Sequence, residues 1–426
     1  MGQGVLTAGF PRVDGTLLAE GVPLARIAEQ AGTPAFVYSA ALVRERYRAL
    51  DAVLSPVAHR VHYTLKANSN LALLRLLREM GSGVDVVSGG ELYRALRAGF
   101  SGHDIIFGGV GKTDDELREA LAAGVALINA ESEAEVRAID RIAAELRVDA
   151  RVSLRVNPEV TVDAAHHYIK TGERGHKFGI PFDEALRVAR VAAGLPRVTL
   201  AGLDMHLGSM LTHVEPYRAG AARLAELCAA VRGAGVDTLR HLDVGGGLSV
   251  RYADETPIDL DEFAAAVLPV ARATALDLVV EPGRFIVGNA GVLLTRVLYR
   301  KHSGGREYAV VDAGMTELIR PSYYKAYHRI EMVRPADGQG VLDVVGPVCE
   351  TGDFLALDRT MDDPAAGDLL AVFDAGAYGS VMGSNYNSRR RPAEVLVDGD
   401  RFAVVTERES YEDLVRREVD HPDWRQ

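Results

Sequence analysis

Short apolar runs alternate with amphipathic, alanine- and leucine-rich segments through most of the first two-thirds of the chain. The apolar runs are rich in Val, Ile and Leu, as buried parallel strands are, and the segments between them have the composition of helices. Eight such strand and helix pairs over roughly 250 residues are typical of a (β/α)8 barrel of the TIM type. The predicted strands are residues 61–65, 84–87, 104–107, 125–129, 151–156, 199–207, 241–244 and 277–281.

The pattern changes after about Val287, where shorter β-rich runs are separated by turn residues. This spacing predicts a second, mainly β domain. We therefore expect three parts: an N-terminal segment (1–35) that joins the β domain, a barrel (36–286) and a C-terminal β domain (287–426). The β-rich runs are residues 308–312, 341–345, 369–374, 394–397 and 402–406.

Composition narrows the class of protein. The chain has 426 residues, 48% of them hydrophobic, and a formal net charge of -11 without a marked basic stretch. These values predict a globular protein and argue against nucleic-acid binding. Two cysteines, Cys228 and Cys349, give neither a disulfide framework nor metal-ligand spacing. With no signal-peptide pattern and no apolar run of about 18 residues, we expect a cytoplasmic protein without a membrane partner.

Residues suited to chemistry follow several of the predicted strands. An active site in such a barrel lies at the carboxyl ends of the strands, so these residues are expected to converge. Lys66 follows the first strand, and Glu281-Pro-Gly283-Arg284 forms a corner at the end of the eighth. The remaining candidates are His206 and Ser209 after the sixth strand and Gly245, Gly246 and Gly247 after the seventh.

This set favours pyridoxal phosphate as cofactor. The glycine run lets backbone N–H groups approach a phosphate, and we expect a helix to start directly after it. Lys66 would bind the cofactor as a Schiff base, and Glu281 would keep the ring nitrogen protonated. His206 would stack on the ring and Ser209 would bind the phosphate. Taken singly, each feature has an ordinary structural alternative: a flexible turn, a lysine that reaches solvent, or a core histidine.

A longer series of motifs resembles one enzyme family over nearly the whole chain. The series is similar to that of the diaminopimelate decarboxylases, which are fold-type III pyridoxal-phosphate enzymes. Its motifs are His62-Tyr-Thr-Leu-Lys66-Ala-Asn68, Asp85-Val-Val-Ser-Gly-Gly-Glu91, Arg155-Val-Asn157-Pro158, Lys177-Phe-Gly-Ile180, Asp243-Val-Gly-Gly-Gly247, Glu281-Pro-Gly-Arg284, Arg320-Pro321, Gly346-Pro-Val-Cys349-Glu350 and Asp374-Ala-Gly-Ala-Tyr378.

The resemblance implies a role for each motif. Lys66, His206 and Glu281 take the cofactor roles given above, and Gly283 joins Ser209 and the glycine run around the phosphate. Tyr378 closes over the phosphate. Arg284, Arg320 and Tyr324 hold the far carboxylate of the substrate. Cys349 and Glu350 form a pair that is supplied across a homodimer interface.

The implied reaction converts meso-2,6-diaminopimelate to L-lysine and carbon dioxide, the last step of lysine biosynthesis. Diaminopimelate has a second carboxylate and a second ammonium, which suit Arg forks and Glu350 respectively. Alternatives are a related decarboxylase acting on ornithine, arginine, carboxynorspermidine or a carrier-bound amino acid, or a non-catalytic homologue that binds the cofactor. His166, His167 and His176 lack the fixed spacing of a ligand set, so no metal is expected.

Overall fold

The computed structural model describes residues 9–160, 176–422 and 424. The chain divides into two compact units. The first, which we call the β unit, comprises Met1–Leu42 and Asn289–Gln426; the second, the barrel unit, comprises Val43–Gly288.

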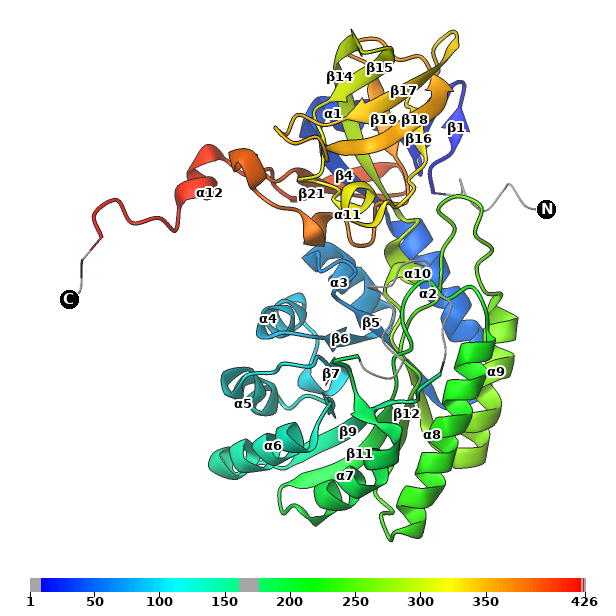
Figure 1. The fold of residues 1–426 in the computed structure, drawn as a ribbon, viewed down its shortest axis with the longest axis vertical. Helices are drawn as coiled ribbons and strands as arrows, with labels where there is room; N and C mark the ends of the chain where they lie inside the picture. The colour runs from blue at the N-terminus through cyan, green and yellow to red at the C-terminus, as the bar shows by residue number, and fades with distance from the viewer. Residues whose placement is uncertain (1–8, 161–175, 423, 425–426) are drawn as a thin grey trace. The chain divides into compact units, whose positions relative to one another are not determined.

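The barrel unit contains eight parallel strands that close into a ring (Figure 1). The sheet runs β9-β11-β12-β13-β5-β6-β7-β8, and β8 pairs again with β9. All eight predicted strands are confirmed, and a two-residue strand, β10 (Ile180–Pro181), adds to β9. The ring strands are β5 (His59–Thr64), β6 (Gly83–Val86), β7 (Ile105–Phe107), β8 (Leu127–Ala130), β9 (Ala150–Asn157), β11 (Val198–Asp204), β12 (His241–Asp243) and β13 (Asp277–Val280).

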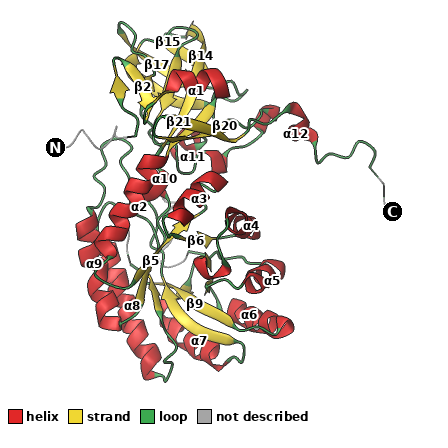
Figure 2. Ribbon diagram, turned by 180° about the vertical axis from the view of Figure 1, so that it is seen from behind, coloured by secondary structure: helices red, strands yellow, loops and turns green. Residues whose placement is uncertain are grey.

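Helices surround the ring, as Figure 2 shows in red around the yellow strands. Several begin at a side-chain cap: the Thr113 hydroxyl accepts from Glu116 N–H, and Glu116 bonds back to Thr113 N–H. Gly99 and Gly124 end two helices in the left-handed conformation. The helices are α2 (Ala40–Leu54), α3 (Leu71–Glu79), α4 (Gly89–Ala98), η1 (Gly102–Asp104), α5 (Asp114–Ala123), α6 (Glu133–Leu146), α7 (Phe182–Gly194), α8 (Glu215–Gly233), α9 (Leu260–Thr274) and α10 (Arg284–Val287).

Parallel pairing brings the carboxyl ends of the ring strands to one level. Thr64 pairs with Asp85, and Asp204 pairs with both Arg155 and Asp243. Lys66, His206 and Glu281 each follow a strand end by one or two residues. The register alone therefore gathers the predicted site residues of this unit at one end of the barrel.

The β unit is built on a nine-stranded sheet that includes part of the N-terminal segment. Strand β4 (Ala35–Ser39) lies between β14 and β20, so the predicted joining of this segment to the β domain is confirmed. The longest strand, β14, was not predicted, and neither was β18. The strands are β14 (Gly291–Ser303), β15 (Arg306–Val311), β16 (Ile330–Met332), β17 (Gln339–Val345), β18 (Phe354–Asp362), β19 (Leu369–Val372), β20 (Ala393–Asp398) and β21 (Arg401–Thr406).

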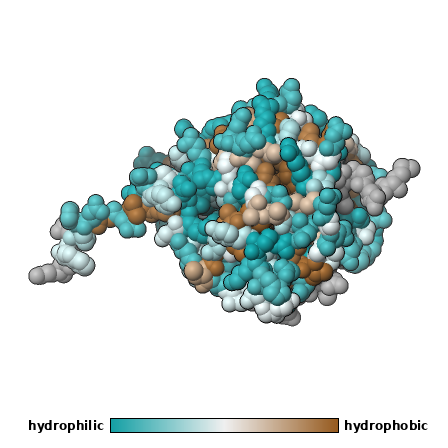
Figure 3. Space-filling model, turned by 90° about the horizontal axis from the view of Figure 1, so that it is seen from above, coloured by the Kyte–Doolittle hydropathy of each residue, from teal (hydrophilic) through white to brown (hydrophobic). Residues whose placement is uncertain are grey.

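Smaller elements complete this unit. A three-stranded sheet of β1 (Arg12–Val13), β2 (Thr16–Ala19) and β3 (Val22–Pro23) leads into α1 (Leu24–Ala31). Later come α11 (Arg320–Tyr324), η3 (Ser380–Met382), η4 (Tyr386–Ser388) and α12 (Tyr411–Val415). The molecular face drawn in Figure 3 is mostly hydrophilic with scattered hydrophobic patches. None of the helices in the described ranges is long and apolar enough to cross a membrane.

Candidate active site

Three carboxylates are buried together at the carboxyl end of the barrel. One oxygen from each of Asp204, Asp243 and Glu281 lies within 4.8 Å of the others. They come from the ends of three adjacent strands, β11, β12 and β13. Asn129 Nδ2 donates to Glu281 Oε1 at 3.4 Å, and Gly245 N–H donates to Asp243 Oδ1 at 2.8 Å.

Burial makes these carboxyl groups hold their protons. It raises the pKa of Asp243 to about 7, against the hydrogen bond from Gly245. Burial and then Asp243 and Asp85 raise the pKa of Glu281 well above its usual value. The pKa of Asp204 is raised by burial and by Asp243 in the same way. The end of the barrel therefore has more acidic groups than its surroundings can keep ionised, and a bound cation would relieve this.

His206 lies beside the glycine run. Gly246 N–H is directed at His206 Nδ1 at 3.3 Å, and because a backbone N–H can only donate, Nδ1 accepts. Burial lowers the pKa of His206 well below its usual value, helped by the charges of Lys66 and Arg155. The His206 ring is therefore neutral, with its proton on Nε2. A neutral imidazole is compatible with stacking on a cofactor ring.

The glycine run has no room for side chains. Gly245 and Gly247 have φ values of +70° and +108°, which favour glycine. A Cβ on Gly246 would lie 2.2 Å from Glu281 O. The predicted helix directly after Gly247 is wrong: residues 248–259 contain no helix and α9 begins at Leu260. The loop instead continues along Leu211, with Leu211 N–H bonded to Gly247 O at 3.0 Å.

Arg284 is buried and held by two hydroxyl groups. Its Nη1 donates to Tyr252 Oη at 2.7 Å, and its Nη2 lies 3.3 Å from Ser209 Oγ. Both Arg284 and Ser209 were predicted site residues, and they are in contact. Gly283 is also enclosed, since a Cβ there would meet Thr64 and Ala67 at 2.5 and 2.9 Å.

The other predicted residues lie in the β unit. Arg320, at the start of α11, is buried, and Tyr324 ends the same helix. Cys349 and Glu350 are exposed in the turn after β17. Cys349 N–H donates to Asn387 Oδ1 at 3.0 Å. Tyr378 has φ +55°, a conformation that is uncommon for a non-glycine residue and clusters at functional sites.

Sequence reasoning missed several residues of the site. Asp204 and Tyr252 belonged to no motif, and Asp85, Asp243 and Arg155 stood inside motifs without a role. Asp204 and Asp243 could have been found from the sequence, because each is an acidic residue at the end of an apolar strand. Carboxylates are rarely buried in protein cores without a partner, so an acidic residue in such a place indicates a site. Of the three histidines weighed as ligands, His166 and His167 lie outside the described residues.

The barrel residues fit pyridoxal phosphate. A cationic pyridine ring suits the buried acid cluster, a neutral His206 suits a ring face, and a loop that excludes every Cβ suits close approach of a phosphate. Lys66 directly follows β5 and acts on the pKa values of both Glu281 and His206, so its ammonium lies near them. Lys66 would hold the aldehyde carbon, Glu281 the ring nitrogen, and the loop the phosphate.

Comparisons with known proteins identify the family of the chain. Residues 40–288 match the family described as "Pyridoxal-dependent decarboxylase, pyridoxal binding domain". The diaminopimelate decarboxylase of Pseudomonas aeruginosa is 50% identical over 406 residues, covering 95% of this chain and 97% of the relative. The relative from Vibrio cholerae is 46% identical over 94% of this chain and 96% of its own length.

Solved structures give the same result. The diaminopimelate decarboxylase of Helicobacter pylori in complex with L-lysine is 37% identical, with a TM-score of 0.89 over 92% of this chain and 98% of that one. The enzyme from M. jannaschii, also in complex with L-lysine, has a TM-score of 0.93 at 32% identity, over 98% and 99% of the two chains. The chain belongs to the diaminopimelate decarboxylase family of pyridoxal-dependent decarboxylases.

Proposed function

We propose that this chain removes carbon dioxide from meso-2,6-diaminopimelate with pyridoxal phosphate and releases L-lysine, the last step of lysine biosynthesis. The observation that carries the proposal is the buried acid cluster around Glu281, next to a loop that admits no side chain. When bound, the cofactor supplies a protonated pyridine ring that accepts the electron pair left by the departing carboxylate.

The barrel residues have separate tasks in this reaction. Lys66 would hold the cofactor at its aldehyde carbon, the place that the substrate's amine also needs. Glu281, beside Asp243 and Asp204, would hold a proton at the ring nitrogen, and His206 would keep the ring in position. Cys349 or the displaced Lys66 amine then returns a proton to the carbon that lost its carboxylate. Either group can do so chemically, since a thiol and an ammonium group are both proton donors.

Selectivity for diaminopimelate rests on its second amino-acid end. We assign its far carboxylate to Arg284, Arg320 and Tyr324, and its far ammonium to Glu350. Buried guanidinium groups suit this task because they bind a carboxylate with two parallel hydrogen bonds. Arg284 and Arg320 are both buried. Tyr378 is assigned to the cofactor phosphate, which its unusual backbone conformation supports.

We further propose a homodimer in which Cys349 and Glu350 serve the neighbouring subunit's barrel. Their exposure in a turn of the β unit supports this, because residues that act on their own subunit's buried ligand would normally be covered. The Glu350 side chain is hydrogen-bonded to Tyr386, which raises the pKa of that tyrosine. Tyr386 would thereby orient the carboxylate toward the partner. The cytoplasmic location remains a prediction.

The test is a substrate comparison with purified protein and pyridoxal phosphate. Meso-diaminopimelate, L-ornithine, L-arginine and carboxynorspermidine are supplied separately, and carbon dioxide and the amine product are measured. We expect kcat/KM to be highest for meso-diaminopimelate, with L-lysine formed in equal amount to carbon dioxide. Faster turnover of ornithine or arginine would overturn the substrate assignment, and no turnover of any of the four would overturn the activity.

A further inference from the structure

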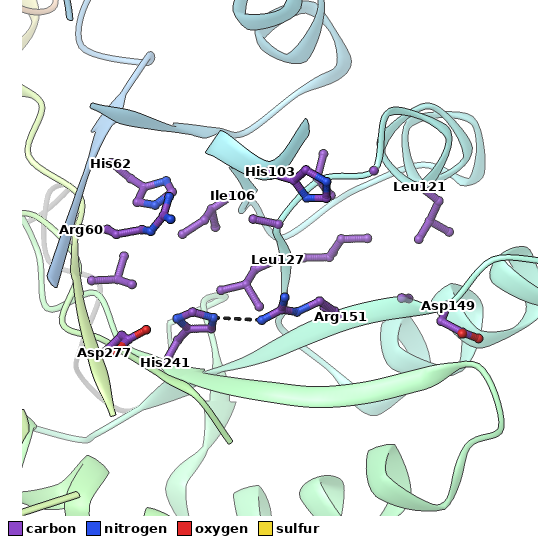
Figure 4. Close-up of a pocket in the computed structure, with 16 residues that line it drawn as sticks. Arg60, His62, His103, Ile106, Leu121, Leu127, Asp149, Arg151, His241 and Asp277 are labelled. Atoms are coloured by element: carbon purple, nitrogen blue, oxygen red, sulfur yellow. Dashed lines mark hydrogen bonds between the residues drawn. The ribbon is translucent and has the colours of Figure 1, made fainter. Parts of the chain in front are cut away.

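A cavity opens at the end of the barrel opposite to Lys66 and Glu281. It has a volume of ≈360 Å³, and the residues that line it include Arg60 and His62 of β5, Arg151 of β9 and His241 of β12. Figure 4 shows these side chains gathered around it from β5, β9 and β12. From Asp277 at this end to Glu281 at the other, four strand residues span roughly 13 Å.

An apolar layer separates the cavity from the acid cluster. Ile106, Leu127, Ala201 and Val279 pack into one buried group in the barrel interior. Three of them, Ile106, Leu127 and Val279, also line the cavity. The cavity therefore has an apolar floor and a basic rim, and it is not an extension of the cofactor site.

The cavity carries an excess of positive charge. Arg60 and Arg151 line it, and no ion pair joins either guanidinium to a carboxylate of the described residues. Two carboxylates line it as well. Asp149 forms an ion pair at 3.1 Å with Arg197, which does not line the cavity. Asp277 forms no ion pair with any of the described residues. One positive charge of the two arginines thus remains uncompensated.

Two histidines that line the cavity have lowered pKa values. Burial, together with the charges of Arg60 and His241, lowers the pKa of His62 to about 4, against the hydrogen bond with Val84 O and the charge of Asp104. Burial followed by the charge of Arg151 lowers the pKa of His241. Both rings are neutral near pH 7, so they offer hydrogen bonds to a ligand without adding charge.

One of these rings leaves a donor without a partner. Arg151 Nη2 lies 3.0 Å from His241 Nε2. A guanidinium can only donate, so Nε2 accepts and the neutral ring has its proton on Nδ1. His241 Nδ1 is buried and has no hydrogen-bond partner among the described groups. Buried unpaired donors are rare in native proteins and call for an explanation such as a missing ligand.

We propose that this cavity, which we call the amino-end pocket, binds a small organic oxyanion: a carboxylate or phosphate monoester on an apolar body. Arg60 and Arg151 bind the oxygens, and the layer of Ile106, Leu127 and Val279 contacts the apolar body. The volume lies in the range of small-molecule sites, and both arginines are exposed at the rim, so a ligand can enter from solvent.

Titration calorimetry of the holoenzyme with three probes tests the proposal. Phenyl phosphate and benzoate carry the two oxyanions on one apolar ring, and benzylamine carries a cation. Loading pyridoxal phosphate first fills the cofactor's own phosphate loop. We expect phenyl phosphate, benzoate or both to bind with a dissociation constant of about 1 mM or below, and benzylamine not to bind. The stronger of the two anions identifies the preferred oxyanion.

Arg60→Gln and Arg151→Gln should each weaken that binding about tenfold or more, because a charge-assisted hydrogen bond is lost. Arg97→Gln removes an exposed arginine of α4 that does not line the pocket and should leave binding unchanged. Thermal unfolding checks that all three variants fold. The proposal fails if neither anion binds at concentrations up to about 10 mM, or if binding survives both substitutions, as it would at the substrate site.

Discussion

At the scale of single residues, the site is defined by carboxylates that a fold would normally avoid. Asp204, Asp243 and Glu281 are buried against one another, where each disfavours ionisation of the next. Such groups are destabilising unless a ligand compensates them, which is why strongly shifted pKa values mark functional sites. A cationic cofactor ring provides that compensation.

The stability of the apoenzyme should therefore fall with rising pH in a way that depends on Asp243. In the unfolded chain this carboxyl ionises near the ordinary aspartate pKa of 3.8, whereas in the folded chain it holds its proton up to about 7. Between these values the folded state binds more protons, so the free energy of unfolding decreases as pH rises. Asp243→Asn removes this contribution, at most about 4 kcal/mol across the window.

Denaturant unfolding of the two apoenzymes between pH 4 and pH 7 measures the difference. Wild type should lose stability relative to Asp243→Asn as pH rises, and saturation with pyridoxal phosphate should reduce that loss. Parallel pH profiles for the two proteins would show that Asp243 does not hold a proton in the folded apoenzyme.

Tyr252 should act as a positioning residue for Arg284. Its hydroxyl accepts from Arg284 Nη1 at 2.7 Å inside the barrel unit. Tyr252→Phe removes one hydrogen bond to a charged group, worth about 1.5–3 kcal/mol. We expect KM for diaminopimelate to rise roughly tenfold or more while kcat changes less and the cofactor absorbance is retained.

Tyr93→Phe is the matched control, because Tyr93 is 69% exposed on α4. Steady-state kinetics of both variants measure the changes in KM and kcat for diaminopimelate. A Tyr252→Phe enzyme whose kcat falls with unchanged KM would mean that Arg284 does not bind the ground-state substrate.

Tyr252 could not be predicted from sequence, because it reaches Arg284 across 32 positions and stands in no motif. Lys66, Glu281 and the glycine run could be predicted, since their chemistry is visible at the ends of apolar strands. The difference lies in what the local sequence contains: reactive residue types at strand ends are local, while a contact between a loop residue and the first residue of α10 depends on tertiary structure.

At the scale of elements, the barrel was predictable because its strands are short apolar runs between helices. Strand β14 was not, because its burial changes along its length: Gly291–Thr295 are buried and the last residues are exposed. It pairs with β4 and β19 first and with β15 later. A single pattern of alternating hydrophobic and polar residues therefore does not describe the whole of this strand. The loop after Gly247 was misjudged because glycine runs often precede helices.

Gly246→Ala tests the fit of that loop. The added methyl group would lie 2.2 Å from Glu281 O and would displace β13 or the loop. We expect a stability loss of about 1–3 kcal/mol and a marked drop in affinity for pyridoxal phosphate. Thermal unfolding and titration of the cofactor absorbance measure the two effects.

Gly111→Ala serves as the control, since a Cβ there meets nothing within 4 Å and its φ is not positive. A Gly246→Ala protein with the stability and cofactor affinity of Gly111→Ala would contradict the close packing of the loop against Glu281.

At the scale of the whole molecule, the proposed function assigns roles to residues of the barrel unit, of the β unit and of a second subunit. The sequence motifs of the barrel and of the β unit occur in one chain, but which subunit combines them is a property of the assembly. Motifs alone could indicate the Cys349–Glu350 pair only through resemblance.

Mixing two inactive variants tests this arrangement. If Glu350 serves the partner's barrel, a dimer of one Lys66→Ala and one Glu350→Ala subunit has one intact site and one site with both changes. After dissociation and random reassociation, half of the dimers are mixed, so about one quarter of the wild-type activity should return. No recovery, despite mixed dimers seen by native mass spectrometry, would place both residues in the same subunit's site.

The most direct measurement of the central claim is product formation from meso-diaminopimelate by wild type and by Lys66→Ala, both supplied with pyridoxal phosphate. Wild type should release carbon dioxide and L-lysine in equal amounts. Lys66→Ala should fold, lose the cofactor absorbance that depends on its amine, and form neither product at a measurable rate. Substantial turnover by Lys66→Ala, or a wild-type protein that leaves meso-diaminopimelate unchanged, would contradict the account.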